Sequence, residues 1–145
     1  MRAVVQRVKE TVLKVNGETV SSIPYGLIVY LGVKKGDDAK KALHLAQKIS
    51  KLRVFEDENG KMNKSVLDVN GEILSVSQFT LYGDVSHGNR PGFSDAETPE
   101  LASPIYDYFC EKLIEQGVVV KRGIFGADMK ISQLSDGPVT IIYDI

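Results

Sequence analysis

The chain has 145 residues, enough for one domain with a hydrophobic core of its own. It is 43% hydrophobic and 26% charged, which is ordinary for a soluble globular protein. The net charge of -1, from 18 basic and 19 acidic residues, does not fit a protein that coats nucleic acid, because non-specific affinity comes mainly from neutralised phosphates. An enzyme that grips only the end of an RNA is still compatible with it.

No apolar run approaches the roughly 20 residues that a membrane span needs, and the N-terminus does not resemble a signal peptide. We therefore expect a cytoplasmic protein without a membrane partner. The one cysteine, Cys110, allows no intrachain disulfide, and its apolar neighbours indicate a buried, inert thiol. Two histidines, His44 and His87, are a poor supply for a zinc site, so we expect no metal and no cofactor.

Strands dominate the first third of the chain. Residues 2–8 alternate between apolar and polar, and residues 11–15 run into Asn16-Gly17, a strong hairpin signal, with a return strand at 18–23. Residues 26–33 are almost continuously apolar, which predicts a central strand covered on both faces.

The first helix is predicted to begin near Ala39, capped by Asp37 or Asp38, and to end near Leu52. One stripe of this helix is apolar and lysines lie opposite, as expected for a helix that packs on a core. A short strand is expected to begin at residues 53–55.

The middle of the chain alternates turn signals with a long strand. Asn59-Gly60 and Asn70-Gly71 bracket a polar hairpin or extended arm, and residues 72–81 form the next strand. Residues 82–97 follow as a loop of about fifteen residues, a length at which loops are usually functional or mobile.

The second helix is predicted to start at Thr98-Pro99, with a capping hydroxyl and then proline at the first helical position, and to close at Gly117. The remaining strands are expected near residues 118–120, 125–132 and 139–143. About eight strands and two amphipathic helices indicate a single α+β domain over residues 1–145. We expect helix/sheet/sheet layers, with mostly antiparallel strands curling toward a partly closed barrel.

The strand containing Ser77, Gln78, Phe79 and Thr80 carries polar side chains. Alternation predicts that Gln78 and Thr80 point together and that Ser77 points the other way unless a bulge intervenes. The pattern alone favours an ordinary strand with one polar face, which is common in antiparallel sheets. Neither histidine has an obvious hydroxyl partner in sequence, so no Ser-His-Asp set suggests itself.

Gly137-Pro138, after Asp136 and before an apolar strand, has two interpretations. It can be an ordinary turn, or it can be a cis X-Pro bond, which is usually a deliberate feature when found.

Two further segments also have two interpretations each. Residues 89–93 could contact a phosphate and a base or could be plain surface. Residues 125–129 could form a flat slot for a planar ring or a core with a tight turn.

Together, five segments resemble the D-aminoacyl-tRNA deacylases, in order and spacing and over essentially the whole chain. The segments are residues 1–8, 77–84, 88–91, 125–129 and 136–140. Any one of them alone would be weak, but five in order are specific. Gly83 and Gly92 stand where other small residues are common in the family, which affects loop flexibility more than chemistry.

The resemblance implies a homodimer that hydrolyses the ester between a D-amino acid and the 3′-terminal adenosine of tRNA, and that also removes glycine mischarged onto tRNA for alanine. It implies that Gly137-Pro138 is cis and enters the pocket of the other subunit. There the pair rejects L-amino acids by exclusion. Arg7 resembles the residue that holds this pair in place.

The resemblance also assigns the catalytic edge to Ser77, Gln78, Phe79 and Thr80. Backbone N–H groups around Phe79 and Thr80 would form an oxyanion hole, and Gln78 is similar to a residue that positions substrate or water. We favour attack by water over attack by the Thr80 hydroxyl, which has no base beside it. The family's adenosine site corresponds to Ala102, Phe125 and Met129.

Two rival functions are considered. One is a non-catalytic nucleic-acid-binding protein on the same fold, although near-neutral charge argues against it and we expect no DNA partner. The other is an editing module for L-serine or a similar product, which the Gly-Pro pair would exclude.

Overall fold

A computed structural model describes all residues from 1 to 145. They form seven strands, two α-helices and one 3₁₀ turn. In chain order these are β1 (Arg2–Val15), β2 (Glu18–Gly32), α1 (Ala39–Ser50), β3 (Phe55–Glu56), β4 (Met62–Lys64), β5 (Glu72–Ser77), η1 (Phe79–Tyr82), α2 (Pro99–Glu115), β6 (Val119–Arg122) and β7 (Met129–Asp144).

The main sheet has five strands in the order β6-β5-β2-β1-β7, and β3 and β4 form a separate hairpin. β1 is antiparallel to β2 and to β7, whereas β5 is parallel to β2 and to β6. Parallel neighbours need a long crossover, and α1 and α2 lie in the two crossovers. Both crossovers advance the same way across the sheet, so a right-handed path places both helices on one face.

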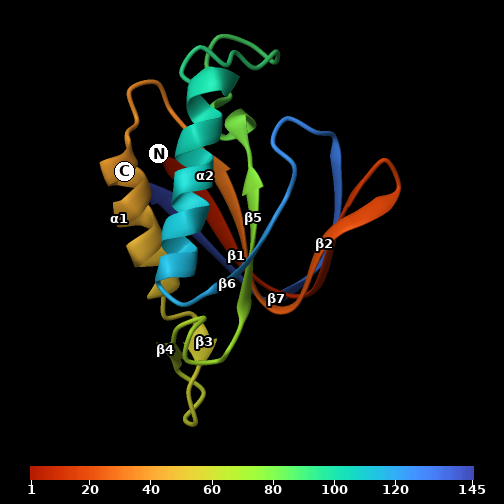
Figure 1. The fold of residues 1–145 in the computed structure, drawn as a ribbon, viewed down its shortest axis with the longest axis vertical. Helices are drawn as coiled ribbons and strands as arrows, with labels where there is room; N and C mark the ends of the chain where they lie inside the picture. The colour runs from red at the N-terminus through yellow and green to blue at the C-terminus, as the bar shows by residue number, and fades with distance from the viewer.

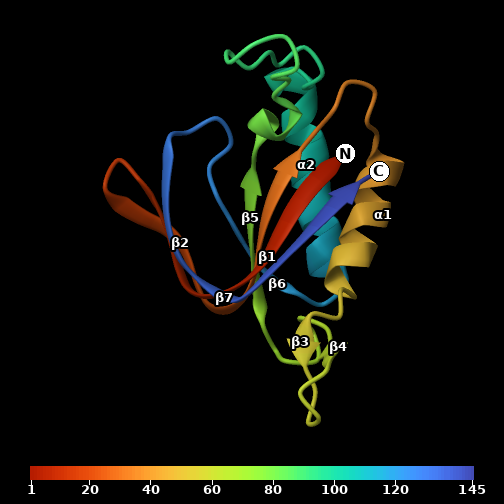
Figure 2. The same ribbon diagram turned by 180° about the vertical axis from the view of Figure 1, so that it is seen from behind.

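Figure 1 shows α1 and α2 side by side over one face of the sheet, and Figure 2 shows the strands from behind. A core cluster of 22 buried residues lies between helices and sheet. A second cluster lies on the other face, where the far ends of β1, β2 and β7 bend away from the helices. The predicted helix/sheet/sheet arrangement is therefore confirmed. The sheet is mixed and does not close into a barrel, with β6 and β7 at its two edges.

The first predicted strands were too short, because each pair of them is one continuous strand in the structure. The strands expected at 2–8 and 11–15 are one strand, β1, which is irregular at Glu10, where φ is 46°. The strands expected at 18–23 and 26–33 are likewise one strand, β2. Two long antiparallel strands can continue through an irregularity as long as their pairing resumes beyond it.

The strand predicted over residues 72–81 ends at Ser77 and turns into η1. This turn lies directly over the end of β2, because a Cβ at Gly32 would be 3.1 Å from the Gln78 carbonyl oxygen and 3.2 Å from the Leu81 Cβ. The absence of a side chain at Gly32 therefore gives η1 the space to cross over the neighbouring strand.

The helix ends follow the sequence closely. The Asp38 side chain caps α1 by accepting from the Lys41 amide at 3.0 Å. Thr98 is the N-cap residue of α2, but its hydroxyl makes no capping bond, so that detail of the prediction was wrong. Gly117 follows α2 with φ of 93°, as a glycine that ends a helix should. Neither helix is long and apolar enough to cross a membrane.

Candidate active site

A cavity of about 580 Å³ opens where β5 passes into η1. Its walls come from the end of β2, the first turns of α2, and residues 125–131 at the start of β7. Six of the residues singled out from sequence line it: Ser77, Gln78, Phe79, Ala102, Phe125 and Met129. Segments that are far apart in the chain therefore meet around one cavity.

Thr80 lies beside this cavity and is not part of its lining. Its hydroxyl is exposed and accepts a hydrogen bond from the Gln78 side-chain amide. The two side chains thus point together as predicted, although η1 brings them together and not strand alternation. No carboxylate or imidazole is hydrogen-bonded to the Thr80 hydroxyl, so nothing there can take its proton.

The backbone of η1 presents amide donors at this edge. The first N–H groups of a helical turn have no partner inside the turn. The N–H groups of Phe79 and Thr80 occupy these positions and make no hydrogen bond to backbone outside η1. The turn is held by bonds from the Gln78 amide to the Leu31 carbonyl at 2.8 Å and from the Gly83 amide to the Thr80 carbonyl at 2.9 Å. Two neighbouring amides are therefore free to bind an anionic oxygen.

Aromatic side chains form the upper and inner walls of the cavity. Phe79 is 57% exposed and meets Phe93 edge-to-face, with ring centroids 5.0 Å apart. Deeper in the cavity, Phe125 tilts against Tyr106 at 6.1 Å. The Tyr106 hydroxyl donates to the Ser75 carbonyl at 2.9 Å, and burial raises the pKa of this phenol well above its usual range. Tyr106 is therefore a neutral wall of the cavity that also ties α2 to β5.

The cavity's charged lining residues are both acidic, namely Glu97 and Asp128. Glu97 accepts from the Thr98 amide at 2.8 Å and from the Gly36 amide at 3.4 Å, while Asp128 pairs with Lys130 at 3.0 Å. No lysine, arginine or histidine lines the cavity. Nowhere in the chain do three metal-ligating side chains gather. The cavity therefore suits a largely apolar ring beside groups that donate and accept hydrogen bonds.

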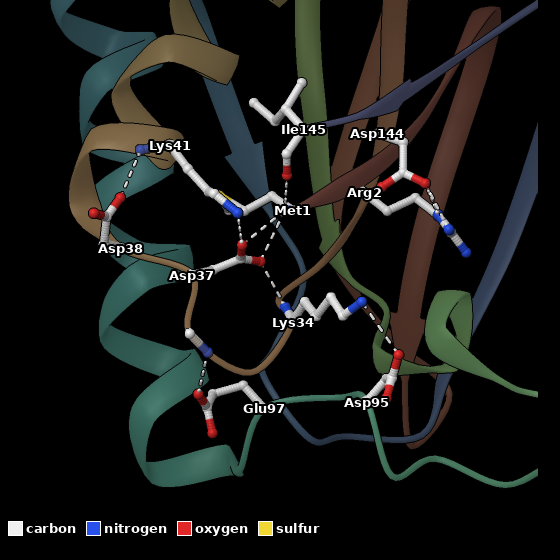
Figure 3. A network of polar contacts seen from close by, with 11 residues as sticks. Met1, Arg2, Lys34, Asp37, Asp38, Lys41, Asp95, Glu97, Asp144 and Ile145 are labelled. Atoms are coloured by element: carbon white, nitrogen blue, oxygen red, sulfur yellow. Dashed lines mark hydrogen bonds and ion pairs between the residues drawn. The ribbon is translucent and has the colours of Figure 1, made fainter.

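A buried ion network behind the cavity fixes one of its walls (Figure 3). The Asp37 carboxylate binds the Met1 ammonium at 2.9 Å, the Lys41 ammonium at 2.9 Å and the Lys34 amide at 2.7 Å. Hydrogen bonds from the Lys35 amide to the Asp95 carbonyl and from the Glu97 amide to the Val33 carbonyl, both 3.0 Å, join this loop to the segment before α2. Val33, Ala96 and Glu97 line the cavity, so the network positions them.

Arg7, Gly137 and Pro138 form a second group that does not line the cavity within one chain. Gly137 and Pro138 are exposed in the middle of β7, and the peptide bond between them is cis. Arg7 is buried beneath them. Its Nη1 donates to the Val54 carbonyl at 2.6 Å, and its Nε lies 3.1 Å from an Asp136 carboxylate oxygen.

Among the polar and aromatic lining residues, sequence reasoning did not single out Glu97 and Tyr106. Phe93 also lines the cavity, and it belongs to the segment 89–93 that was already considered as a contact for a base. Glu97 directly precedes the helix cap, so its position gave a signal. Tyr106 gave none, because an aromatic residue on the inner face of a helix is usually core. Cys110 on the same helix is buried as expected, and burial raises the pKa of its thiol.

The family model described as D-Tyr-tRNA(Tyr) deacylase matches residues 4–144 of the chain. The chain belongs to this family. A protein from Geotalea daltonii, named D-aminoacyl-tRNA deacylase, is 54% identical over 99% of this chain and 96% of its own length. A Bacillus thuringiensis protein of the same name is 52% identical over 99% of both chains. The resemblance inferred from the five segments is therefore confirmed.

Two solved structures share the fold. One, titled c-Myc DNA Unwinding Element Binding Protein, is 45% identical, with a TM-score of 0.93 over 100% of this chain and 99% of that one. The other is titled as a probable eukaryotic D-amino acid tRNA deacylase. It is 20% identical, with a TM-score of 0.85 over 99% of this chain and 98% of that one, so it supports the fold alone.

Proposed function

We propose that this protein hydrolyses the ester bond of D-aminoacyl-tRNA and releases the D-amino acid and free tRNA. One observation carries the proposal: a largely apolar cavity of about 580 Å³ lies beside two unpartnered backbone amides, those of Phe79 and Thr80. Membership of the family and the names of relatives at 52–54% identity point to the same substrate.

In this mechanism the terminal adenosine enters the cavity, with Ala102, Phe125 and Met129 around the base. Water attacks the ester carbonyl carbon, and the Phe79 and Thr80 amides hold the oxyanion that forms. Each such donor can contribute roughly 2.7–4 kcal/mol to the transition state. The bond from the carbonyl carbon to the ribose oxygen then breaks, and the ribose oxygen takes a proton.

The hydrolytic step needs no threonine nucleophile. Gln78 donates to the Thr80 hydroxyl, and an amide N–H cannot act as a base. Gln78 and Ser77 instead orient the ester or the attacking water, and a ribose hydroxyl of the substrate helps the proton transfer. Aminoacyl esters are already labile, so modest stabilisation is enough.

The chain acts as a homodimer in the cytoplasm, with each cavity completed by the other subunit. The exposed Gly137-Pro138 pair of a second copy enters the cavity and occupies the space that an L side chain would need. D side chains point elsewhere and glycine has none, so D-aminoacyl-tRNA and glycine mischarged on tRNA for alanine are both cleaved. Arg7 holds the pair in position, which is supported by its contact with Asp136.

Filling the cavity tests the proposal. Ala102 is 8% exposed and faces the hollow, so Ala102→Leu adds carbon atoms to the space for the adenosine. We expect kcat/KM for D-tyrosyl-tRNA to fall at least tenfold. Leu101→Ala, at an exposed position of the same helix, should leave it unchanged. Full activity of a folded Ala102→Leu protein would contradict the assignment of this cavity.

A second candidate function is nucleic-acid binding without catalysis, because the solved structure at 45% identity is titled as a DNA-unwinding-element-binding protein. It predicts binding to plain duplex that weakens with salt, and no release of amino acid from D-tyrosyl-tRNA. The deacylase predicts release, and it predicts that plain duplex does not compete with the substrate.

A further inference from the structure

A second hollow, of about 450 Å³, lies at the C-terminal end of α1, away from the candidate active site. Basic side chains dominate its lining. The polar and aromatic residues around it are His44, Gln47, Lys48, Lys51, Arg53 and Tyr143, and no acidic residue is among them. Figure 1 shows α1, whose second half contributes most of this lining.

The cations of this hollow are not neutralised. Neither Lys48 nor Lys51 takes part in an ion pair. Arg53 donates only to the Asn63 carbonyl, at 2.9 Å from its Nε. Residues 39–55 contain five lysines or arginines and no acidic residue before Glu56. The positive charge is therefore concentrated and available.

Each of the other basic clusters of the chain has one member that is neutralised. Lys34 pairs with Asp95, Lys41 with Asp37, Lys64 with Glu58 and Arg122 with Asp107. Cations near a helix C-terminus are favoured by the helix dipole, which accounts for Lys48 and Lys51. The dipole does not account for Arg53, which lies outside the helix, nor for the hollow into which these side chains gather with His44.

A tRNA substrate needs cations that the active-site cavity does not supply. That cavity is lined by two carboxylates and no basic residue, and the chain as a whole carries a net charge of -1. Affinity for RNA comes largely from neutralised phosphates. A protein of this charge must therefore bind the phosphates with a local cluster away from the 3′ end.

The spacing suits such a substrate. The N-terminal end of α1 follows the loop that carries Val33 of the active-site cavity, and the basic hollow runs along the second half of α1, from His44 to Lys51 just beyond its end. The 12 residues of α1 span about 18 Å at 1.5 Å per residue. An RNA whose 3′ end enters the cavity is long enough to bring upstream phosphates across this distance.

We propose that the hollow formed by His44, Lys48, Lys51 and Arg53 binds the phosphodiester backbone of the RNA substrate, upstream of its 3′ end. This inference rests on the proposed function for its choice of RNA. It assigns the hollow a role in substrate affinity and none in the chemical step.

The test uses the double variant Lys48→Glu/Lys51→Glu in the full-length protein. Its control is Lys14→Glu/Lys121→Glu, which reverses two exposed lysines that also lack ion pairs. Binding of deacylated tRNA is measured at several salt concentrations. We expect the first variant to bind at least tenfold more weakly at low salt, with the slope of log K against log salt reduced by about 1–2, as for one or two lost phosphate contacts. The control should match the unaltered protein.

Hydrolysis separates this inference from the proposed function. D-tyrosyl-adenosine, which has no upstream phosphates, should be cleaved equally by the unaltered protein and the first variant. kcat/KM for D-tyrosyl-tRNA should fall in the variant through KM. An unaltered protein that cleaves neither substrate would refute the proposed function, while the salt slopes would still decide the role of the hollow. Equal slopes in the two variants would overturn the inference.

Discussion

Arg7 reaches Asp136 twice: its Nε lies 3.1 Å from the carboxylate and donates to the Asp136 carbonyl at 3.2 Å. A Cβ at Gly137 would lie 3.3 Å from the Arg7 Nη2. The guanidinium thus supports the backbone that presents Gly137 and Pro138, and it does so from a side chain that is 8% exposed. This contact links a buried residue of β1 to an exposed feature of β7.

Arg7→Met should destabilise the protein and loosen its selectivity. It leaves the Val54 and Asp136 carbonyls without this donor and the Asp136 carboxylate without its buried partner, which should cost about 3 kcal/mol, the lower end for a broken buried pair, since Asp136 is 25% exposed and keeps Lys9. Urea unfolding measures the loss. Lys9→Met removes the exposed partner of Asp136 and should cost under about 1 kcal/mol. Equal losses in the two variants would contradict the role given to Arg7.

Thr80→Ala should keep most of the activity. The Thr80 hydroxyl has no base, and the proposed oxyanion hole is made by backbone that the substitution leaves in place. We expect kcat for D-tyrosyl-tRNA to stay within about tenfold, because the substitution removes neither the attacking water nor an oxyanion donor, the groups whose loss lowers kcat by orders of magnitude. If the folded variant bound tRNA normally and lost all activity, a covalent route through Thr80 would replace the water route.

Because of Asp37, the free energy of unfolding should depend on pH under acidic conditions. Burial acts to raise the pKa of this carboxyl, but hydrogen bonds from Lys41, the Met1 ammonium and the Lys34 amide outweigh it and hold the pKa below 3.8. A lowered folded-state pKa gives stability that is present above about pH 4 and lost as the pH falls through the folded-state value.

The comparison of Asp37→Asn with the unaltered protein by thermal unfolding tests this account. At pH 7 the variant should be less stable by about 3–5 kcal/mol, since the side chain is 1% exposed, and the gap should narrow below pH 4. Asp95→Asn removes an exposed partner of Lys34 and should show a small gap that changes little with pH. A pH-independent gap for Asp37→Asn would contradict the ion-network account.

The sequence predicted the helix ends correctly, but it did not predict where β5 ends or how it pairs with its neighbours. Asp38, Pro99 and Gly117 marked helix ends correctly because capping is local chemistry. The end of β5 at Ser77 could not be predicted, because it depends on η1 crossing over Gly32 of another strand. The parallel pairing of β5 likewise depends on where the helical crossovers return the chain, which alternation along one strand does not encode.

The site residues likewise fall into those that the sequence predicted and those that depend on packing in the folded protein. The family motifs identified Ser77, Gln78 and Phe79 at the cavity, together with Ala102, Phe125 and Met129. They did not identify Tyr106, whose place in the wall depends on the packing of α2 against β5. The basic hollow was missed although Lys48, Lys51 and Arg53 lie close together in the sequence, because the hollow itself forms only where Tyr143 of β7 packs beside them.

Heterodimers test whether the two groups of site residues act across subunits. Ala102→Leu blocks the cavity of one subunit, while Arg7→Met loosens the Gly137-Pro138 pair of the other. This heterodimer is purified through a different tag on each subunit. Its one open cavity belongs to the Arg7→Met subunit, and the Gly137-Pro138 pair of the Ala102→Leu subunit is still supported by Arg7. If the pair acts across subunits, the heterodimer should cleave D-tyrosyl-tRNA and spare the L form. Cleavage of the L form at half the rate of the Arg7→Met homodimer would indicate action in cis, and an active monomer by sedimentation would refute the dimer.

The most direct measurement is the rate of amino-acid release from D-tyrosyl-tRNA and from L-tyrosyl-tRNA by the same protein preparation, with the spontaneous rate of each subtracted. A chirality-selective deacylase should release D-tyrosine rapidly and leave the L ester at its spontaneous rate. Equal inaction on both esters, or faster cleavage of the L ester, would contradict the account.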